Sequence, residues 1–134
     1  MKKPIFALQW HITSECDQRC RHCYIFNSKE IHEKKKDLDL DDIVSVLKNL
    51  MNCCVELNAN PSIAFTGGDP LLRKDFFLIL DAANREAKKN SFDEINIDVM
   101  GNPFHLNAES AKRLKESGVK RYQISVLKIY LMFM

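Results

Sequence analysis

The chain alternates short stretches of strand character with longer stretches of helix character, and this alternation constrains its fold most. β-branched and aromatic residues in alternating patterns predict strands at residues 5–13, 61–66, 94–100 and 120–126. Apolar residues at helical spacing predict helices from about residue 39 to 57, from the "GGDP" turn to about residue 87, and from Asn107 to a stop at Gly118. This order predicts consecutive βαβ units, and therefore an α/β fold with about four parallel strands and three helices.

One face of the predicted strands is polar, although both faces of a strand in an ordinary barrel are largely apolar. The polar set comprises Gln9, His11, Thr13, Asn96, Asp98, Gln123 and Ser125. Because polar groups are costly to bury in a dry core, this face is predicted to border a cavity for polar ligands. The candidates for substrate contact are His11, Asn96, Asp98 and Gln123. An exposed sheet face in an incomplete protein is the alternative interpretation.

Composition and charge limit the class of protein and its partners. The 134 residues are 46% hydrophobic and 28% charged, which is typical of one soluble globular domain. A net charge of +2 is too small to favour nucleic acid or an anionic membrane as a partner, and no apolar stretch reaches the roughly 18 residues of a membrane span. With no secretory signal, five cysteines favour free or metal-bound thiols in a reducing cytoplasm. Two of them, Cys53 and Cys54, are adjacent in a predicted helix and are expected to be buried as small apolar side chains.

The other three cysteines, Cys16, Cys20 and Cys23, crowd into the loop 14–26 directly after the first predicted strand. Three closely spaced thiolates suit a cubane iron-sulfur cluster in which one iron has no protein ligand. A structural zinc site needs a fourth ligand and stays open as an alternative. The histidines that could supply that ligand are His11, His22 and His32.

The second predicted strand ends in the glycine turn "GGDP", residues 67–70. Two glycines allow a tight turn, Asp69 can cap the following helix, and Pro70 suits its first turn. The same turn presents backbone groups and a carboxylate at the carboxyl edge of the sheet, which suits an ammonium group. The residues 100–102, "MGN", and Ser125 are predicted to lie at that edge too, where parallel barrels usually carry their chemistry.

The cysteine pattern, with the aromatic His22 just before the last cysteine, resembles that of the radical S-adenosylmethionine (radical SAM) superfamily. The resemblance implies an incomplete TIM-type (β/α) barrel and two cofactors, a [4Fe-4S] cluster and S-adenosylmethionine. Cys16, Cys20 and Cys23 would bind three irons, and the amino and carboxylate groups of S-adenosylmethionine would chelate the fourth. His22 would lie near the adenine.

The glycine turn is similar to the Gly-Gly-Glu-Pro motif of the same family, with Asp69 in place of the glutamate. The resemblance implies that Gly67, Gly68 and Asp69 contact the methionine amino group, and that Ser125 contacts the ribose. The implied reaction is reductive cleavage of S-adenosylmethionine to a 5′-deoxyadenosyl radical, which abstracts hydrogen from a substrate, here a peptide or protein. An electron donor is then a further partner. No side chain is needed as an acid or base, so no catalytic residue is assigned.

The chain is shorter than a complete core of this family, which has six βα units. The glycine-containing segment of a fifth strand has no counterpart, so residues 1–134 are interpreted as a partial core domain without the C-terminal part of the barrel. A truncated or frameshifted fragment and one piece of a split enzyme both fit this interpretation. A non-catalytic cluster-binding or partner-binding module, or a zinc-binding structural domain, is the alternative function.

Overall fold

The structure is a computed structural model that describes residues 1–21, 23 and 36–124. The predictions for His22, His32 and Ser125 therefore lie outside the described residues.

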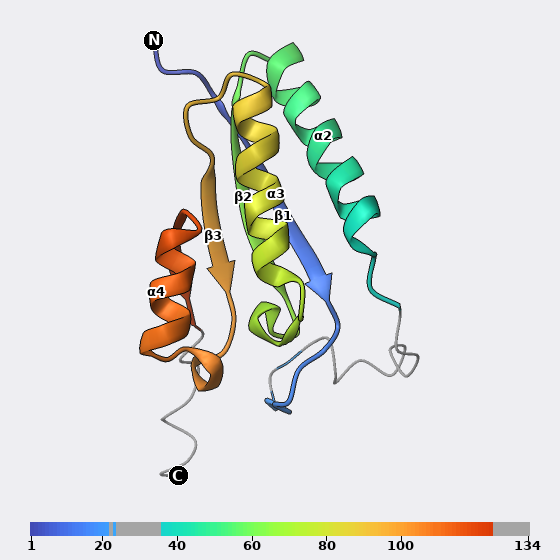
Figure 1. Ribbon diagram of the computed structural model, residues 1–134, viewed down its shortest axis with the longest axis vertical. Coiled ribbons are helices and arrows are strands. Elements are labelled where there is room, and N and C mark those ends of the chain that lie inside the picture. The colour runs from blue at the N-terminus through green and yellow to red at the C-terminus, as the bar shows by residue number, and fades with distance from the viewer. Residues whose placement is uncertain (22, 24–35, 125–134) are drawn as a thin grey trace.

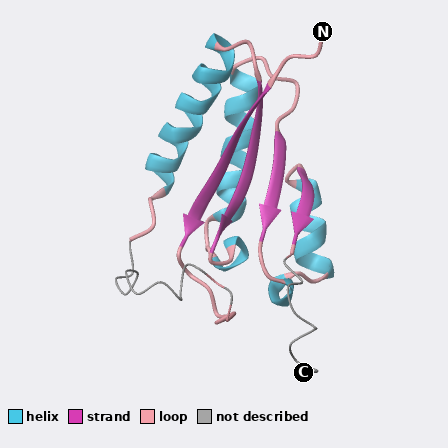
Figure 2. Ribbon diagram, turned by 180° about the vertical axis from the view of Figure 1, so that it is seen from behind, coloured by secondary structure: helices cyan, strands magenta, loops and turns pink. Residues whose placement is uncertain are grey.

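Within those residues the chain forms one parallel sheet with its helices on one face. The strands are β1 (Ile5–Thr13), β2 (Asn60–Gly67), β3 (Asn96–Met100) and β4 (Val119–Gln123), in the spatial order β1-β2-β3-β4. The helices are α2 (Leu40–Glu56), α3 (Phe76–Lys89) and α4 (Ala108–Glu116), with short 3-10 turns η1 (Pro70–Leu72) and η2 (Pro103–His105). Figure 1 shows the helices in front of the sheet, and Figure 2 shows the strands in front of the helices. The predicted α/β fold, a partial barrel whose sheet is not closed, is confirmed.

Local capping explains where α2 and α4 begin and where α4 ends. The Asp39 side chain caps α2 by accepting from the Asp42 amide at 2.9 Å. Asn107 and Ser110 form a reciprocal capping box at the start of α4. Gly118, with φ of +84°, follows the end of α4 in the left-handed conformation, as predicted. Among the described residues, no helix is long and apolar enough to cross a membrane.

Two details of the prediction are wrong. The "GGDP" turn does not open α3 directly, because the Asp69 carboxylate caps the 3-10 turn η1 and the extended backbone of Arg73 then breaks the helical path before Phe76. Cys54 is fully buried as expected, but Cys53 is exposed. Neighbours on a helix diverge by about 100°, so only one of the two can face the sheet.

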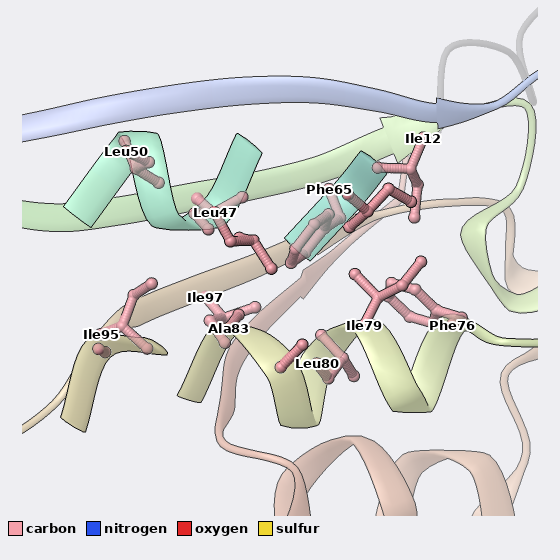
Figure 3. Close-up of a cluster of buried hydrophobic side chains, with 14 of the residues drawn as sticks. Ile12, Leu47, Leu50, Phe65, Phe76, Ile79, Leu80, Ala83, Ile95 and Ile97 are labelled. Atoms are coloured by element: carbon pink, nitrogen blue, oxygen red, sulfur yellow. The ribbon is translucent and has the colours of Figure 1, made fainter. Parts of the chain in front are cut away.

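The core lies between the sheet and the helices (Figure 3). Helix α2 contributes Leu47 and Leu50, and α3 contributes Phe76 and Ile79, all of them buried. Phe76 packs edge-on against Phe65 of β2, with ring centroids 5.8 Å apart. The apolar face of the strands therefore meets the apolar stripes of the helices, as the alternating pattern predicts.

The opposite face of the sheet is polar in the structure. Gln9, His11, Asn96 and Gln123 are exposed, and Asp98 is half-buried. Asp98 accepts from Arg121 of β4 at 2.6 Å, and Asn96 donates to Ser62 of β2 at 3.0 Å. Thr13 departs from this face and is buried, because a register irregularity between His11 and Thr13 turns the end of β1.

Candidate functional site

The segments after β1, β2 and β3 meet at the carboxyl edge of the sheet, the lower edge in Figure 1. The cysteine loop and the glycine turn are joined by backbone hydrogen bonds that continue the pairing of β1 with β2. The Gly68 amide donates to the Thr13 carbonyl at 2.9 Å, and the Asp69 amide donates to the Glu15 carbonyl at 2.7 Å. The predicted convergence of these two segments is therefore present.

The glycines of the turn are required by this close approach. A Cβ atom on Gly67 would lie well under 3.0 Å from the Thr13 carbonyl oxygen, and Gly67 has φ of +133°, where side chains are strained. A Cβ atom on Gly68 would clash with the Glu15 carbonyl oxygen and lie 3.1 Å from Cβ of Cys16. Because the obstacles are backbone atoms, only glycine lets the cysteine loop lie against the turn.

Asp69 is the most unusual side chain of the site, because it is a fully buried carboxylate. Its Oδ1 accepts from the Leu71 amide at 3.1 Å, whereas its Oδ2 has no hydrogen-bond partner in the described part of the chain. Burial raises the pKa of this carboxyl above its ordinary value. A buried polar oxygen without a partner is costly, and an ammonium or N–H donor placed there would satisfy it.

The cysteines occupy different environments. Cys16 and Cys23 are half-buried and Cys20 is exposed, and none of the three is in a disulfide. The Sγ of Cys16 accepts from the Gln18 amide at 3.4 Å, and burial raises the pKa of the Cys16 thiol. Among the described residues, no three Cys, His, Asp or Glu side chains lie close enough together to hold a metal ion. The donors have the right chemistry for an iron-sulfur cluster, and their role as its ligands stays a prediction.

The connection from β3 to α4 closes the site from a third side. The Asn102 side-chain amide donates to Cys16 Sγ at 3.9 Å, and the Asn102 carbonyl accepts from the Tyr122 hydroxyl at 3.0 Å. His105 Nε2 lies 2.6 Å from an oxygen of Asp17, and this hydrogen bond lowers the pKa of Asp17. The position of Asn102 at this edge is predicted from the sequence, whereas that of His105 is not, because no local pattern links His105 to Asp17, 88 positions away.

The sequence and the fold of this chain are similar to those of known proteins. A family model described as the Radical SAM superfamily matches residues 10–129. The chain belongs to the radical SAM superfamily. Its similarity to GTP 3′,8-cyclase of Limosilactobacillus fermentum is 30% identity over 115 residues, covering 86% of this chain and 31% of that protein. Its similarity to the AdoMet-dependent heme synthase of Nitratidesulfovibrio vulgaris is 28% identity over 119 residues, covering 89% of this chain and 29% of that protein.

Solved structures of radical SAM proteins share the fold. A structure described as anSMEcpe with bound AdoMet superposes with a TM-score of 0.67 at 22% identity, covering 90% of this chain and 31% of that chain. The open conformation of BtrN superposes with a TM-score of 0.62 at 20% identity, covering 91% of this chain and 50% of that chain. The chain spans about a third of the length of the curated relatives, at 31% and 29%. Radical SAM proteins bind a [4Fe-4S] cluster and S-adenosylmethionine, so the predicted cofactor pair is that of the family.

Proposed function

We propose that this chain is the cofactor-binding part of a radical SAM enzyme. Cys16, Cys20 and Cys23 hold a [4Fe-4S] cluster, and the turn from Gly67 to Asp69 receives the methionine end of S-adenosylmethionine. The observation that carries the proposal is the unpartnered buried Oδ2 of Asp69, which lies in the turn that bonds to the cysteine loop. Membership of the family supports it independently.

When bound, the cluster and S-adenosylmethionine supply one-electron cleavage of the sulfonium and a radical that abstracts hydrogen from a substrate. The protein's own residues bind and orient these two cofactors. Asp69 Oδ2 accepts a hydrogen bond from an ammonium group, and its burial keeps water from competing for that oxygen. Asn102 donates to the sulfur of Cys16 and thereby stabilises its thiolate. Contacts from His22 to the adenine and from Ser125 to the ribose are part of the proposal.

The polar sheet face is the proposed substrate surface, with His11, Asn96, Asp98 and Gln123 as its contacts. The relatives named above are a GTP cyclase and a heme synthase, so their names differ in substrate and do not identify the substrate of this chain. A peptide substrate is supported by the superposition, with a TM-score of 0.62, on anSMEcpe with bound AdoMet and Cp18Cys peptide. An external electron donor and a reducing cytoplasm complete the proposal, because free thiols and reduced clusters persist there.

The function is tested on protein reconstituted with iron and sulfide without oxygen. We expect a bound cluster and 5′-deoxyadenosine formation from S-adenosylmethionine under a strong reductant. A cluster without 5′-deoxyadenosine would favour the non-catalytic cluster-binding module for this chain. Stoichiometric zinc without acid-labile sulfide would overturn the cluster and favour a structural zinc domain.

The variant Asp69→Asn separates stability from binding. A carboxyl whose pKa is raised by folding contributes stability that is fully present below its ordinary pKa of about 3.9 and is lost as pH rises through the raised value. The variant without cofactors should therefore be more stable than the wild type by about 1 kcal/mol at pH 7, with a flatter pH profile. Its affinity for S-adenosylmethionine should fall about 10-fold or more, because a charge-assisted hydrogen bond is lost.

The measurements for this variant are urea unfolding between pH 4 and 8 and equilibrium binding of S-adenosylmethionine. The exposed Asp81→Asn on α3 is the matched control, and both quantities should stay at wild-type values. Unchanged affinity in Asp69→Asn would contradict the proposed contact.

The variant Asn102→Ala tests the hydrogen bond to Cys16. Removing a donor to a cluster sulfur makes the reduced, more negative state less favourable, so the midpoint potential should fall. A loss of about 1 kcal/mol corresponds to about 40 mV for a one-electron couple. Redox titration of the reconstituted protein measures this shift. Asn96→Ala on the open sheet face is the control and should leave the midpoint potential unchanged. Equal midpoint potentials in the two variants would contradict the proposed hydrogen bond from Asn102 to a cluster ligand.

A further inference from the structure

The segment that carries the three cysteines leaves the end of β1 and leads to α2, and hydrogen bonds tie its two ends together. The Thr13 hydroxyl donates to Asp37 Oδ2 at 2.6 Å, and the Ser14 amide donates to Asp37 Oδ1 at 3.1 Å. Thr13 itself is buried. We call residues 12–14 and 37–38 the loop base. Since Asp37 bonds to both Thr13 and Ser14, the start and the end of this segment lie side by side.

A third segment enters the loop base through Arg73, which follows η1 in the glycine-turn connection. Its Nη1 donates to the Ile12 carbonyl at 2.5 Å, and its Nη2 donates to the Leu38 carbonyl at 2.6 Å. Its Nε donates to Asp75 Oδ1 at 2.6 Å, which holds the guanidinium in place. The Arg73 side chain is only 8% exposed. One buried guanidinium therefore connects both sides of the loop base to the segment after the glycine turn.

We propose that Arg73 is a positioning residue that fixes the three-cysteine loop against the Gly67–Asp69 turn, an inference that rests on the proposed function. The carbonyls of Ile12 and Leu38 come from different segments, and a planar fork of fixed N–H donors can hold both while pairing with Asp75. A lysine ammonium cannot reproduce that fork. The position of the cysteine loop against the glycine turn determines where the three thiols lie relative to Asp69 Oδ2.

The test compares Arg73→Gln with the neighbouring Lys74→Gln, because Lys74 is exposed. In cofactor-free protein, hydrogen exchange at the Gly68 and Asp69 amides should accelerate about 10-fold in Arg73→Gln, since these amides bond to the start of the cysteine loop. The Gly118 amide, which donates to the Lys115 carbonyl at 3.1 Å, is the internal reference, and its exchange rate should change much less. In reconstituted protein, loss of iron to a chelator should accelerate about 10-fold.

Arg73→Lys should fail to restore either rate. If Arg73→Gln does not fold, Asp75→Asn replaces it, because Asp75 holds the guanidinium yet makes no side-chain cap bond to α3. It should raise the same two rates by a smaller factor. Rates equal to those of Lys74→Gln, or equal acceleration at Gly118, would overturn the positioning role. If the wild type assembles no cluster, the proposed function fails while the exchange measurement still decides the role of Arg73.

Discussion

Gly68→Ala is expected to lose cluster assembly and to destabilise the cofactor-free protein by about 3 kcal/mol. The new Cβ would clash with the Glu15 carbonyl oxygen and lie 3.1 Å from Cβ of Cys16. Neither the turn nor the loop can yield locally, because the Asp69 amide bonds to that same carbonyl at 2.7 Å. The cysteine loop must therefore move away from the turn. Denaturant unfolding and iron content per chain measure the two effects.

Gly118→Ala is the matched control for this prediction. Gly118 has φ of +84°, but a Cβ there would meet only the end of the Asn84 side chain, at 3.2 Å. The expected cost is about 1 to 2 kcal/mol from the left-handed backbone alone, with normal cluster content. Equal iron content in Gly68→Ala and Gly118→Ala would show that the close approach of loop and turn does not matter for the site.

Serine at any one of Cys16, Cys20 or Cys23 is expected to lower bound iron and acid-labile sulfide about tenfold or more. A cluster with only two thiolate ligands from the protein is poorly held, and a neutral hydroxyl is a weak replacement. The stability of the cofactor-free protein should change little for Cys20→Ser, because Cys20 is exposed. Iron and sulfide analysis after anaerobic reconstitution measures the loss.

Cys53→Ser is the control, because Cys53 is an exposed thiol on α2 that should not bind iron. Wild-type iron content in all three loop variants would contradict the ligand assignment. Loss of iron in Cys53→Ser alone would place the metal elsewhere in the chain.

Local sequence patterns predicted the elements and their faces well. The first strand was predicted at the residues that form β1, and the predicted helix starts at residue 39 and at Asn107 coincide with the residues that cap α2 and α4. Alternation in the strands correctly separated core residues such as Phe65 and Ile97 from the polar face. These features depend on neighbours in the sequence, which a single chain displays directly.

Contacts between distant segments could not be predicted in the same way. The bond from Arg73 to Ile12 spans 61 positions, and the one between His105 and Asp17 spans 88. The sequence predicts a tight turn at the two glycines, and the structure adds that the Glu15 backbone occupies the space where a side chain on Gly68 would be. The buried, unpartnered oxygen of Asp69 likewise depends on packing that no local pattern reveals.

The most direct test of the central claim is the Mössbauer spectrum of protein reconstituted with iron-57, recorded with and without S-adenosylmethionine. Three cysteine ligands leave one iron of a [4Fe-4S] cluster open, so S-adenosylmethionine should change the signal of one iron in four and leave the others as they were. A cluster spectrum that S-adenosylmethionine does not alter would contradict the claim that the Gly67–Asp69 turn and the cysteine loop form one cofactor site.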